Sequence, residues 1–262
     1  MTVGRIMLFV SLIFSLCITS FADTNIRISG ILQVFTDNGP KGTNTENLRI
    51  KLAVEEGNPD AISFDEEVET SKNFRWMSTG TLFRNETIKI RVYVAEIPEE
   101  YVLWSSPLVE VSVTRPRIQN LHVVIKTPRK TARDCFDLAN ELIQRLEPLG
   151  PSKRNLVRFQ NALDYYDKAL KYWPNPVFQF EKATVLHKVR DYDGCSREYE
   201  TLVEISRDVP NIVMEIKGWF GQISCLKGTM EKWPRSDVAN KIVSVCSQAL
   251  DRGCRQCAPI CR

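Results

Sequence analysis

The sequence predicts a two-domain protein, an all-β antiparallel sandwich followed by an all-α unit of helical repeats. Three observations support this prediction. Apolar residues follow a period of two from residue 26 to 126, and the period changes to 3.6 after the short polar segment 128–131. One apolar helical stripe then recurs after a shift of 33 residues (192 − 159). The expected segments are a signal peptide at 1–22, a β-sandwich at 23–127, a linker at 128–131, three helical hairpins at 132–250 and a Cys-rich tail at 251–262.

The first 22 residues have the three parts of a secretory signal peptide. Arg5 precedes an apolar run from Ile6 to Ile18, and the small residues Ser20 and Ala22 come just before the expected cleavage point. The run is shorter than the ~20 residues that cross a bilayer. We therefore expect an exported protein, periplasmic or extracellular, without stable membrane insertion.

Seven short segments of the first domain have strand character. Gly, Pro, Asn and acidic clusters separate them, and several are apolar on one face and polar on the other. The expected strands are 26–35, 47–55, 73–77, 87–94, 101–104, 107–113 and 121–126. Seven strands in about a hundred residues are typical of an antiparallel sandwich.

The order of these segments resembles a known family. ISGILQVFTDNGPKG, LRIKLAV, SKNFRWMSTGTL, IKIRVYV and NLHVVIK are similar to the carboxypeptidase-regulatory-like (transthyretin-related) sandwiches. Asn73 stands where that family usually has Gly. The resemblance implies a spacer or docking module without a catalytic group, and a fibronectin-type sandwich is the alternative.

The second domain has one continuous helical stripe from Phe159 to Trp173, which Pro174 ends. With Ala162 and Ala169 at its small positions, it resembles the tetratricopeptide repeat, most specifically over residues 161–210. The corresponding small residues of the other units are Ala139, Ala183, Cys195, Gly221 and Gly228. Arg190 replaces the Gly that the family usually has between helices. We expect six helices in three pairs, with long connections at 149–154 and 229–237.

Composition and motifs argue against catalysis and against nucleic-acid binding. The chain has two His residues, a net charge of +3 with interspersed signs, and no metalloprotease, nucleophile-elbow, Walker or dinucleotide motif. We expect no enzyme activity, no cofactor and no metal site. The acidic run from Glu55 to Glu69 is either a solvated loop or a Ca²⁺ site without the spacing of a known loop.

The tetratricopeptide resemblance implies a concave surface lined by the first helix of each pair. Its expected ligand-binding residues are Arg133, Phe136, Asn140, Gln144, Phe180, Thr184, His187, Lys188 and Gln222. These mixed polar, basic and aromatic residues suit another protein or an extended peptide. We therefore expect an exported, non-enzymatic adaptor that binds a protein or peptide. The alternatives are a structural subunit of a cell-envelope or extracellular assembly and a metal or redox protein that uses the Cys-rich tail.

Seven cysteines follow the predicted signal peptide, since one of the eight is Cys17. Cys135, Cys195 and Cys225 fall on expected helices, where packing alone accounts for them. Cys246, Cys254, Cys257 and Cys261 are the disulfide candidates, because an exported chain meets an oxidising compartment. We expect at least one bridge among these four, and zinc is the alternative.

Overall fold

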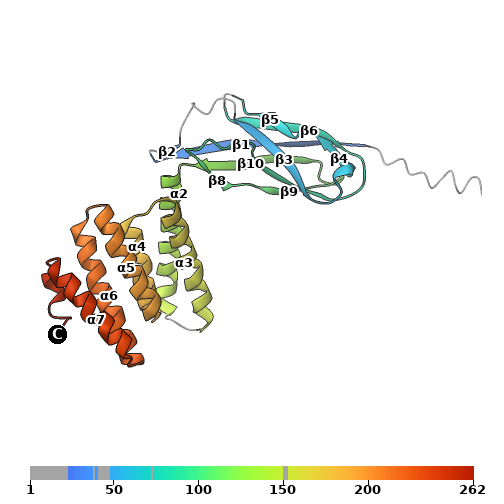
Figure 1. Cartoon of the computed structure of the whole chain (residues 1–262). Helices are drawn as coiled ribbons and strands as arrows, with labels where there is room; N and C mark the ends of the chain where they lie inside the picture. Colours follow the sequence, from blue (N-terminus) through green and yellow to red (C-terminus); the bar gives the residue numbers. More distant parts are fainter. Residues whose placement is uncertain (1–22, 38, 41–47, 72, 150–152) are drawn as a thin grey trace, which may run out of the picture. The chain divides into compact units, whose positions relative to one another are not determined.

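The computed structural model describes residues 23–37, 39–40, 48–71, 73–149 and 153–262. The expected signal peptide at 1–22 lies outside the described residues. The chain divides into two compact units, and the division falls between Thr127 and Pro128 (Figure 1).

The first unit contains two β-sheets. The first, here the β1 sheet, has the strand order β4-β6-β1-β10-β8, with β2 paired to β1. Its strands are β1 (Thr24–Thr36), β2 (Gly39–Pro40), β4 (Ile62–Phe64), β6 (Arg75–Leu82), β8 (Val102–Ser105) and β10 (Arg117–Lys126). The second, here the β3 sheet, has the order β5-β3-β7-β9. Its strands are β3 (Arg49–Glu56), β5 (Glu67–Glu69), β7 (Ile88–Val94) and β9 (Leu108–Val111).

All seven expected strands form, and the short strands β2, β4 and β5 add to them. The pairing differs from the prediction in one respect. The first strand, β1, runs parallel to the last strand, β10, with Arg27 opposite Arg117 and Phe35 opposite Lys126. The other strand pairs of the described residues are antiparallel. Apolar alternation gives the face that each residue occupies but not the direction of its partner strand, so the sequence missed the parallel pair.

The inward side chains of both sheets belong to one hydrophobic cluster. Ile28 and Leu32 of the β1 sheet and Ile50 and Ile90 of the β3 sheet are at most 1% exposed. The alternation predicted this burial, because each strand of period two buries one side and exposes the other.

The second unit is a helical domain of six helices, which follow one another in chain order in Figure 1. They are α2 (Pro128–Leu146), α3 (Lys153–Tyr172), α4 (Pro176–Lys188), α5 (Tyr192–Asp208), α6 (Ile212–Lys232) and α7 (Ser236–Asp251). None of the helices in the described part of the chain is long and apolar enough to cross a membrane.

Two expectations about the connections are wrong. The segment 128–131, expected as a linker, is the first turn of α2, which Pro128 begins in the position that helices tolerate best. The second expected long connection, 229–237, is three residues long, because α6 continues to Lys232 before Pro234. Thr229 is 1% exposed, so its burial favours continuation of the helix.

Small residues lie where helices cross most closely. Ala162 and Ala183 are fully buried. A Cβ atom added at Gly221 of α6 would come within 2.5 Å of the Tyr199 ring of α5. Contacts this short leave no room for a larger side chain, so these positions fix the distance between neighbouring helices.

Candidate binding surface of the helical unit

Helices α2, α4 and α6 neighbour one another through aromatic contacts. The Phe136 ring of α2 stacks on Phe178 of α4 at 4.3 Å between centroids. The Lys217 ammonium of α6 lies 4.8 Å from the ring centroid of Phe180 on α4. These contacts bring residues from three segments of the chain onto adjoining parts of one surface.

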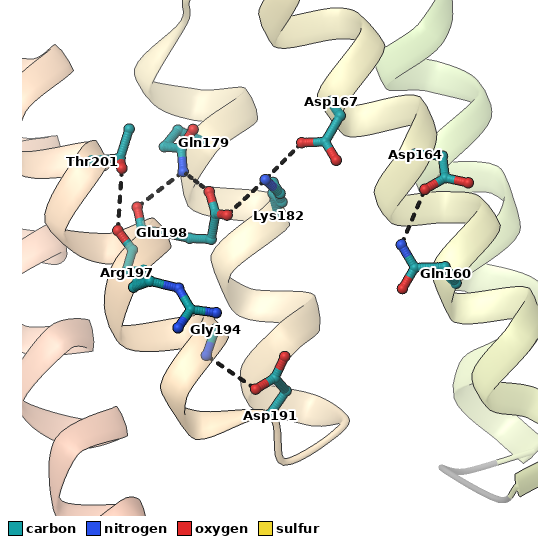
Figure 2. Close-up of polar contacts among 10 residues, drawn as sticks. All are labelled: Gln160, Asp164, Asp167, Gln179, Lys182, Asp191, Gly194, Arg197, Glu198 and Thr201. Carbon is teal, nitrogen blue, oxygen red and sulfur yellow. Dashed lines mark hydrogen bonds and ion pairs between the residues drawn. The ribbon is translucent and has the colours of Figure 1, made fainter.

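The opposite side of α4 is occupied by a polar network (Figure 2). Lys182 donates to Asp167 of α3 at 2.6 Å and to Glu198 of α5 at 2.7 Å. Gln179, only 2% exposed, also donates to the Glu198 carboxylate. Burial alone lowers the pKa of Lys182, but its hydrogen bonds with Asp167 and Glu198 outweigh burial and leave the pKa raised. The network keeps Lys182 charged and ties α4 to both second helices, which gives it a structural role.

Phe180, Thr184, His187 and Lys188 point away from Lys182, because they lie near the opposite side of the helical wheel. We call the surface that they form with the exposed residues of α2 and α6 the α2–α4–α6 face. Its members are Arg133, Phe136, Asn140, Gln144, Val177, Phe180, Thr184, His187, Lys188, Val213, Lys217, Phe220 and Ser224.

Eight of the nine residues expected at the binding surface belong to this face, but they differ in accessibility. Arg133, Gln144, His187 and Lys188 are exposed, whereas Phe136, Asn140, Phe180 and Thr184 are half-buried. Several of the half-buried groups already have partners. Asn140 accepts a hydrogen bond of 2.6 Å from the Tyr166 hydroxyl, and Thr184 and the Tyr199 hydroxyl are 3.1 Å apart.

Gln222 is the one expected residue that the structure removes from the surface. It is 1% exposed and lies inside the helical unit. It lies two positions from both Phe220 and Ser224, so the repeat register gave the wrong rotation of this helix. The outward stripe of α6 consists of the exposed Val213, Lys217 and Phe220 and the half-buried Ser224, spaced by three and four residues.

The sequence analysis missed this α6 stripe. Val213 is 58% exposed and Phe220 46% exposed, so two large apolar side chains seven residues apart face solvent. The signal was present, because the apolar residues of α6 occur on more than one side of its helical wheel. In this helix, the apolar residues on one side pack in the core, and those on another side, Val213 and Phe220, face solvent.

Two positively charged side chains of the α2–α4–α6 face contact aromatic or acidic residues next to it. The Arg133 guanidinium lies 5.6 Å from the Trp173 ring centroid, and Lys188 forms an ion pair with Glu147. Burial, reinforced by Glu181 and Glu147, raises the pKa of the Tyr166 hydroxyl, so this group stays neutral at physiological pH and donates to Asn140. Several polar groups of the face therefore have partners within the chain, whereas Val213 and Phe220 are exposed.

Six of the seven cysteines of the helical unit form disulfides. Cys246 pairs with Cys261 and Cys254 pairs with Cys257, so the expected bridge within the tail is confirmed. All four tail sulfurs are then occupied, which removes the thiolates that the zinc alternative required. The third bridge, Cys195–Cys225, joins α5 to α6 and was missed. The sequence analysis explained Cys195 and Cys225 separately, as small residues packed on helices. Their pairing becomes visible only because the structure places them on facing helices.

The acidic run of the first unit contributes to ion pairs. Arg91 donates twice to Glu55 at 2.8 Å, Lys89 lies 2.6 Å from Glu56, and Glu67 lies near Arg49 and Lys51. These pairs stand on the β3 sheet and use three of the seven carboxylates of the acidic run, Glu55, Glu56 and Glu67. Within the described residues, no group of three or more His, Cys, Asp or Glu side chains is arranged to hold a metal ion.

Comparison with known proteins assigns no family to the chain. No protein-family model matches it, and no curated protein matches it. Among solved structures, it is similar to the N-terminal domain of stress-induced protein-1 (STI-1) from C. elegans, with a TM-score of 0.33 and 17% sequence identity over 45% of this chain and 96% of that one. A similarity of this size carries no argument about function.

Proposed function

We propose that this protein is an exported, non-enzymatic adaptor that binds a protein or an extended peptide through the α2–α4–α6 face. The six helices are compatible with three stacked pairs of the tetratricopeptide type, in which such a face is the binding surface. Three disulfides support export, because disulfides persist in oxidising compartments.

The observation that supports binding most directly is the exposed apolar stripe of α6 beside α4. Val213, Phe220 and Val177 are each at least 40% exposed, and Phe180 lies between them and the core. Apolar residues gathered on one face, with polar groups around them, mark interaction surfaces. The disulfide between α5 and α6 and the Lys182 network hold this face in place, so binding would cost little ordering of the backbone.

The side chains of the same surface also suit a binding role. Its one histidine, His187, packs against the Tyr192 ring at 5.7 Å between centroids. The remaining side chains of the face donate, accept or pack. Hydrogen bonding and apolar packing are the interactions by which a surface binds a protein or a peptide.

A displayed library of random peptides tests the proposal. Peptides selected on the protein should lose binding at least tenfold when Val213 and Phe220 are both changed to Ser. The matched control is Val243→Ser on α7, which removes a side chain that is 70% exposed on a different helix. Melting temperatures of all variants should stay close to that of the unchanged protein. Equal losses in the two variants, or selected peptides that bind only the β unit, would contradict the proposal.

A further inference from the structure

The solvent-facing side of the β1 sheet carries three arginines, none of which forms an ion pair with a carboxylate of the described residues. Buried and outward residues alternate along β1, along most of β6 and over the first three residues of β10, so the residues between the buried ones face solvent there. We define the arginine face as the outward residues Asn25, Arg27, Ser29, Arg75, Met77, Thr79, Thr81, Arg117 and Gln119. It contains three arginines and no acidic residue.

Strand register places two of these arginines side by side. Arg27 of β1 is paired with Arg117 of the parallel strand β10, and with Thr79 of β6 on its other side. Adjacent strands are about 4.8 Å apart, so the two guanidinium groups leave neighbouring positions in the same direction. Like charges directly opposite one another destabilise a sheet. Arg75 is opposite Ile31, four residues further along β1, or roughly 13 Å from Arg27 at the usual rise of a strand.

The outer side of the other sheet shows the opposite arrangement. Arg49 and Lys51 lie near Glu67, and Arg91 is held by both carboxylate oxygens of Glu55. In contrast, Arg27, Arg75 and Arg117 take part in none of the ion pairs that form among the described residues. Acidic groups lie near the face without forming ion pairs with these arginines. Glu69 lines the same hollow as Arg75, and Glu110 lines another hollow with Arg117. Asp65 accepts a hydrogen bond of 3.2 Å from Thr79.

The arginine face is hollowed in two places that share Arg27. One hollow of about 640 Å³ includes Arg27, Ser29, Arg75 and Met77 in its lining. The other, of about 520 Å³, lies between Asn25, Arg27, Thr79, Thr81 and Arg117. Both are open and shallow, so they suit a chain laid across the strands rather than a small enclosed molecule. Hydroxyl and amide groups line them together with the guanidinium groups.

We propose that the arginine face binds a linear acidic polysaccharide that carries sulfate or carboxylate groups. The planar fork of arginine donates two parallel hydrogen bonds to a sulfate or carboxylate, and successive anionic groups of one polymer can reach Arg75, Arg27 and Arg117. The side chains of Asn25, Ser29 and Thr81 supply donors and acceptors for sugar hydroxyls. Binding of a polyanion would reduce the repulsion between the paired Arg27 and Arg117, neither of which forms an ion pair within the described residues.

Two other polyanions fit the same face less well. Single-stranded nucleic acid needs aromatic side chains for its bases to stack on, and the arginine face has none. Binding to an anionic membrane surface is strengthened by apolar side chains that enter the lipid, and Met77 is the one large apolar residue in the defined set. The three disulfides of the chain also favour a compartment where polysaccharides are the common polyanions.

Binding measurements with defined polymers test this proposal on the whole protein, produced with its disulfides formed. The probes are heparin, which carries sulfate, and polygalacturonate, which carries carboxylate; whichever binds identifies the anionic group. At low salt one of them should bind, and affinity should fall steeply as salt is added, because the contacts are between exposed charges. Changing both Arg27 and Arg117 to Gln should weaken this binding at least tenfold.

The matched control changes Arg49 and Lys51 to Gln, which removes the same net charge from the β3 sheet. This variant should bind within about twofold of the unchanged protein, because charge screening limits non-specific effects at a distance. Equal weakening by the two double variants would show a general charge effect and overturn the proposal. Binding to neither polymer, or stronger binding to anionic vesicles or single-stranded DNA than to both, would overturn it as well. The Val213 and Phe220 variant leaves this assay unchanged, so the arginine face and the α2–α4–α6 face are tested separately.

Discussion

The two units of the chain are stabilised in different ways. In the β unit, strands from the beginning and the end of the unit meet in one core, and the parallel pair of β1 and β10 joins its two ends. The helical unit has two buried clusters, one around α2 to α5 and another around α6, α7 and the tail. All cysteines after the expected signal peptide lie in the helical unit. In a stack of repeats, each helical pair contacts only the adjacent pairs, so contacts between distant parts of the chain add little stability. Disulfides between adjacent helices therefore have a larger effect on the stability of this unit than on that of the β unit.

Removing the bridge that closes the tail should have the largest effect. Cys246 and Cys261 enclose a loop of 15 residues, and changing both to Ser should lower the free energy of unfolding of the helical unit by about 3 kcal/mol. Hydrogen exchange measured on peptides across a denaturant series should show the loss in α6, α7 and the tail. The β unit has no cysteine among its described residues and should keep its protection. A loss of similar size in both units would show that they unfold together.

Acid should destabilise the helical unit through Glu215. This carboxylate is 4% exposed and accepts from Arg207 at 3.1 Å and from Arg252 at 3.3 Å, which joins α5, α6 and the segment after α7. Burial raises the pKa of Glu215, but the hydrogen bonds from Arg207 and Arg252 outweigh it and hold the pKa below its ordinary value. A depressed pKa means that the stabilisation is present above the unfolded-state pKa of about 4.3 and is lost as the pH falls through the folded-state pKa.

Glu215→Gln should therefore lower stability at pH 7 by about 1 kcal/mol, a modest value because both arginines are largely in solvent. The difference between the variant and the unchanged protein should shrink as the pH falls below about 4. Thermal unfolding followed by circular dichroism from neutral to acidic pH measures it. The control is Glu55→Gln in the β unit, where the carboxylate and Arg91 are exposed and the effect should be smaller. A Glu215 variant whose deficit persists unchanged at low pH would point to lost packing instead of lost charge.

The smallest expected effect is a gain in stability at the turn between α4 and α5. Arg190 has φ of 63°, in the left-handed region that favours glycine, and its N–H donates to the His187 carbonyl. Arg190→Gly should raise the free energy of unfolding by about 0.5–1 kcal/mol, because glycine adopts this conformation without strain. Denaturant unfolding measures the change.

Asn120 provides the matched control in the β unit, with φ of 61° beside the irregularity in the β1–β10 pairing. Asparagine tolerates the left-handed region, so Asn120→Gly should change stability by only a few tenths of a kcal/mol, less than Arg190→Gly does. If Arg190→Gly lowered the free energy of unfolding, the stabilising contacts of the arginine side chain would outweigh the strain of its left-handed backbone conformation.

The sequence by itself determined the type and order of the main elements, because burial on one side imposes a period on the residues. Period two predicted the seven main strands, and period 3.6 with small residues such as Ala162 predicted six helices. The tail bridges could also be expected, since four cysteines in sixteen residues (246 to 261) cannot lie far apart. Turn chemistry was visible too, because Arg190 stands where glycine would fit better.

Only the tertiary structure decided how residues far apart in the chain meet. Periodicity does not say that β1 runs parallel to β10, and so it could not show that Arg27 and Arg117 are neighbours. It does not fix the rotation of α6 closely enough to distinguish buried Gln222 from exposed Phe220. Nor does it show that Cys195 and Cys225 face each other across two helices. Each of these features depends on a contact between two elements, and a pattern within one element contains no information about its partner.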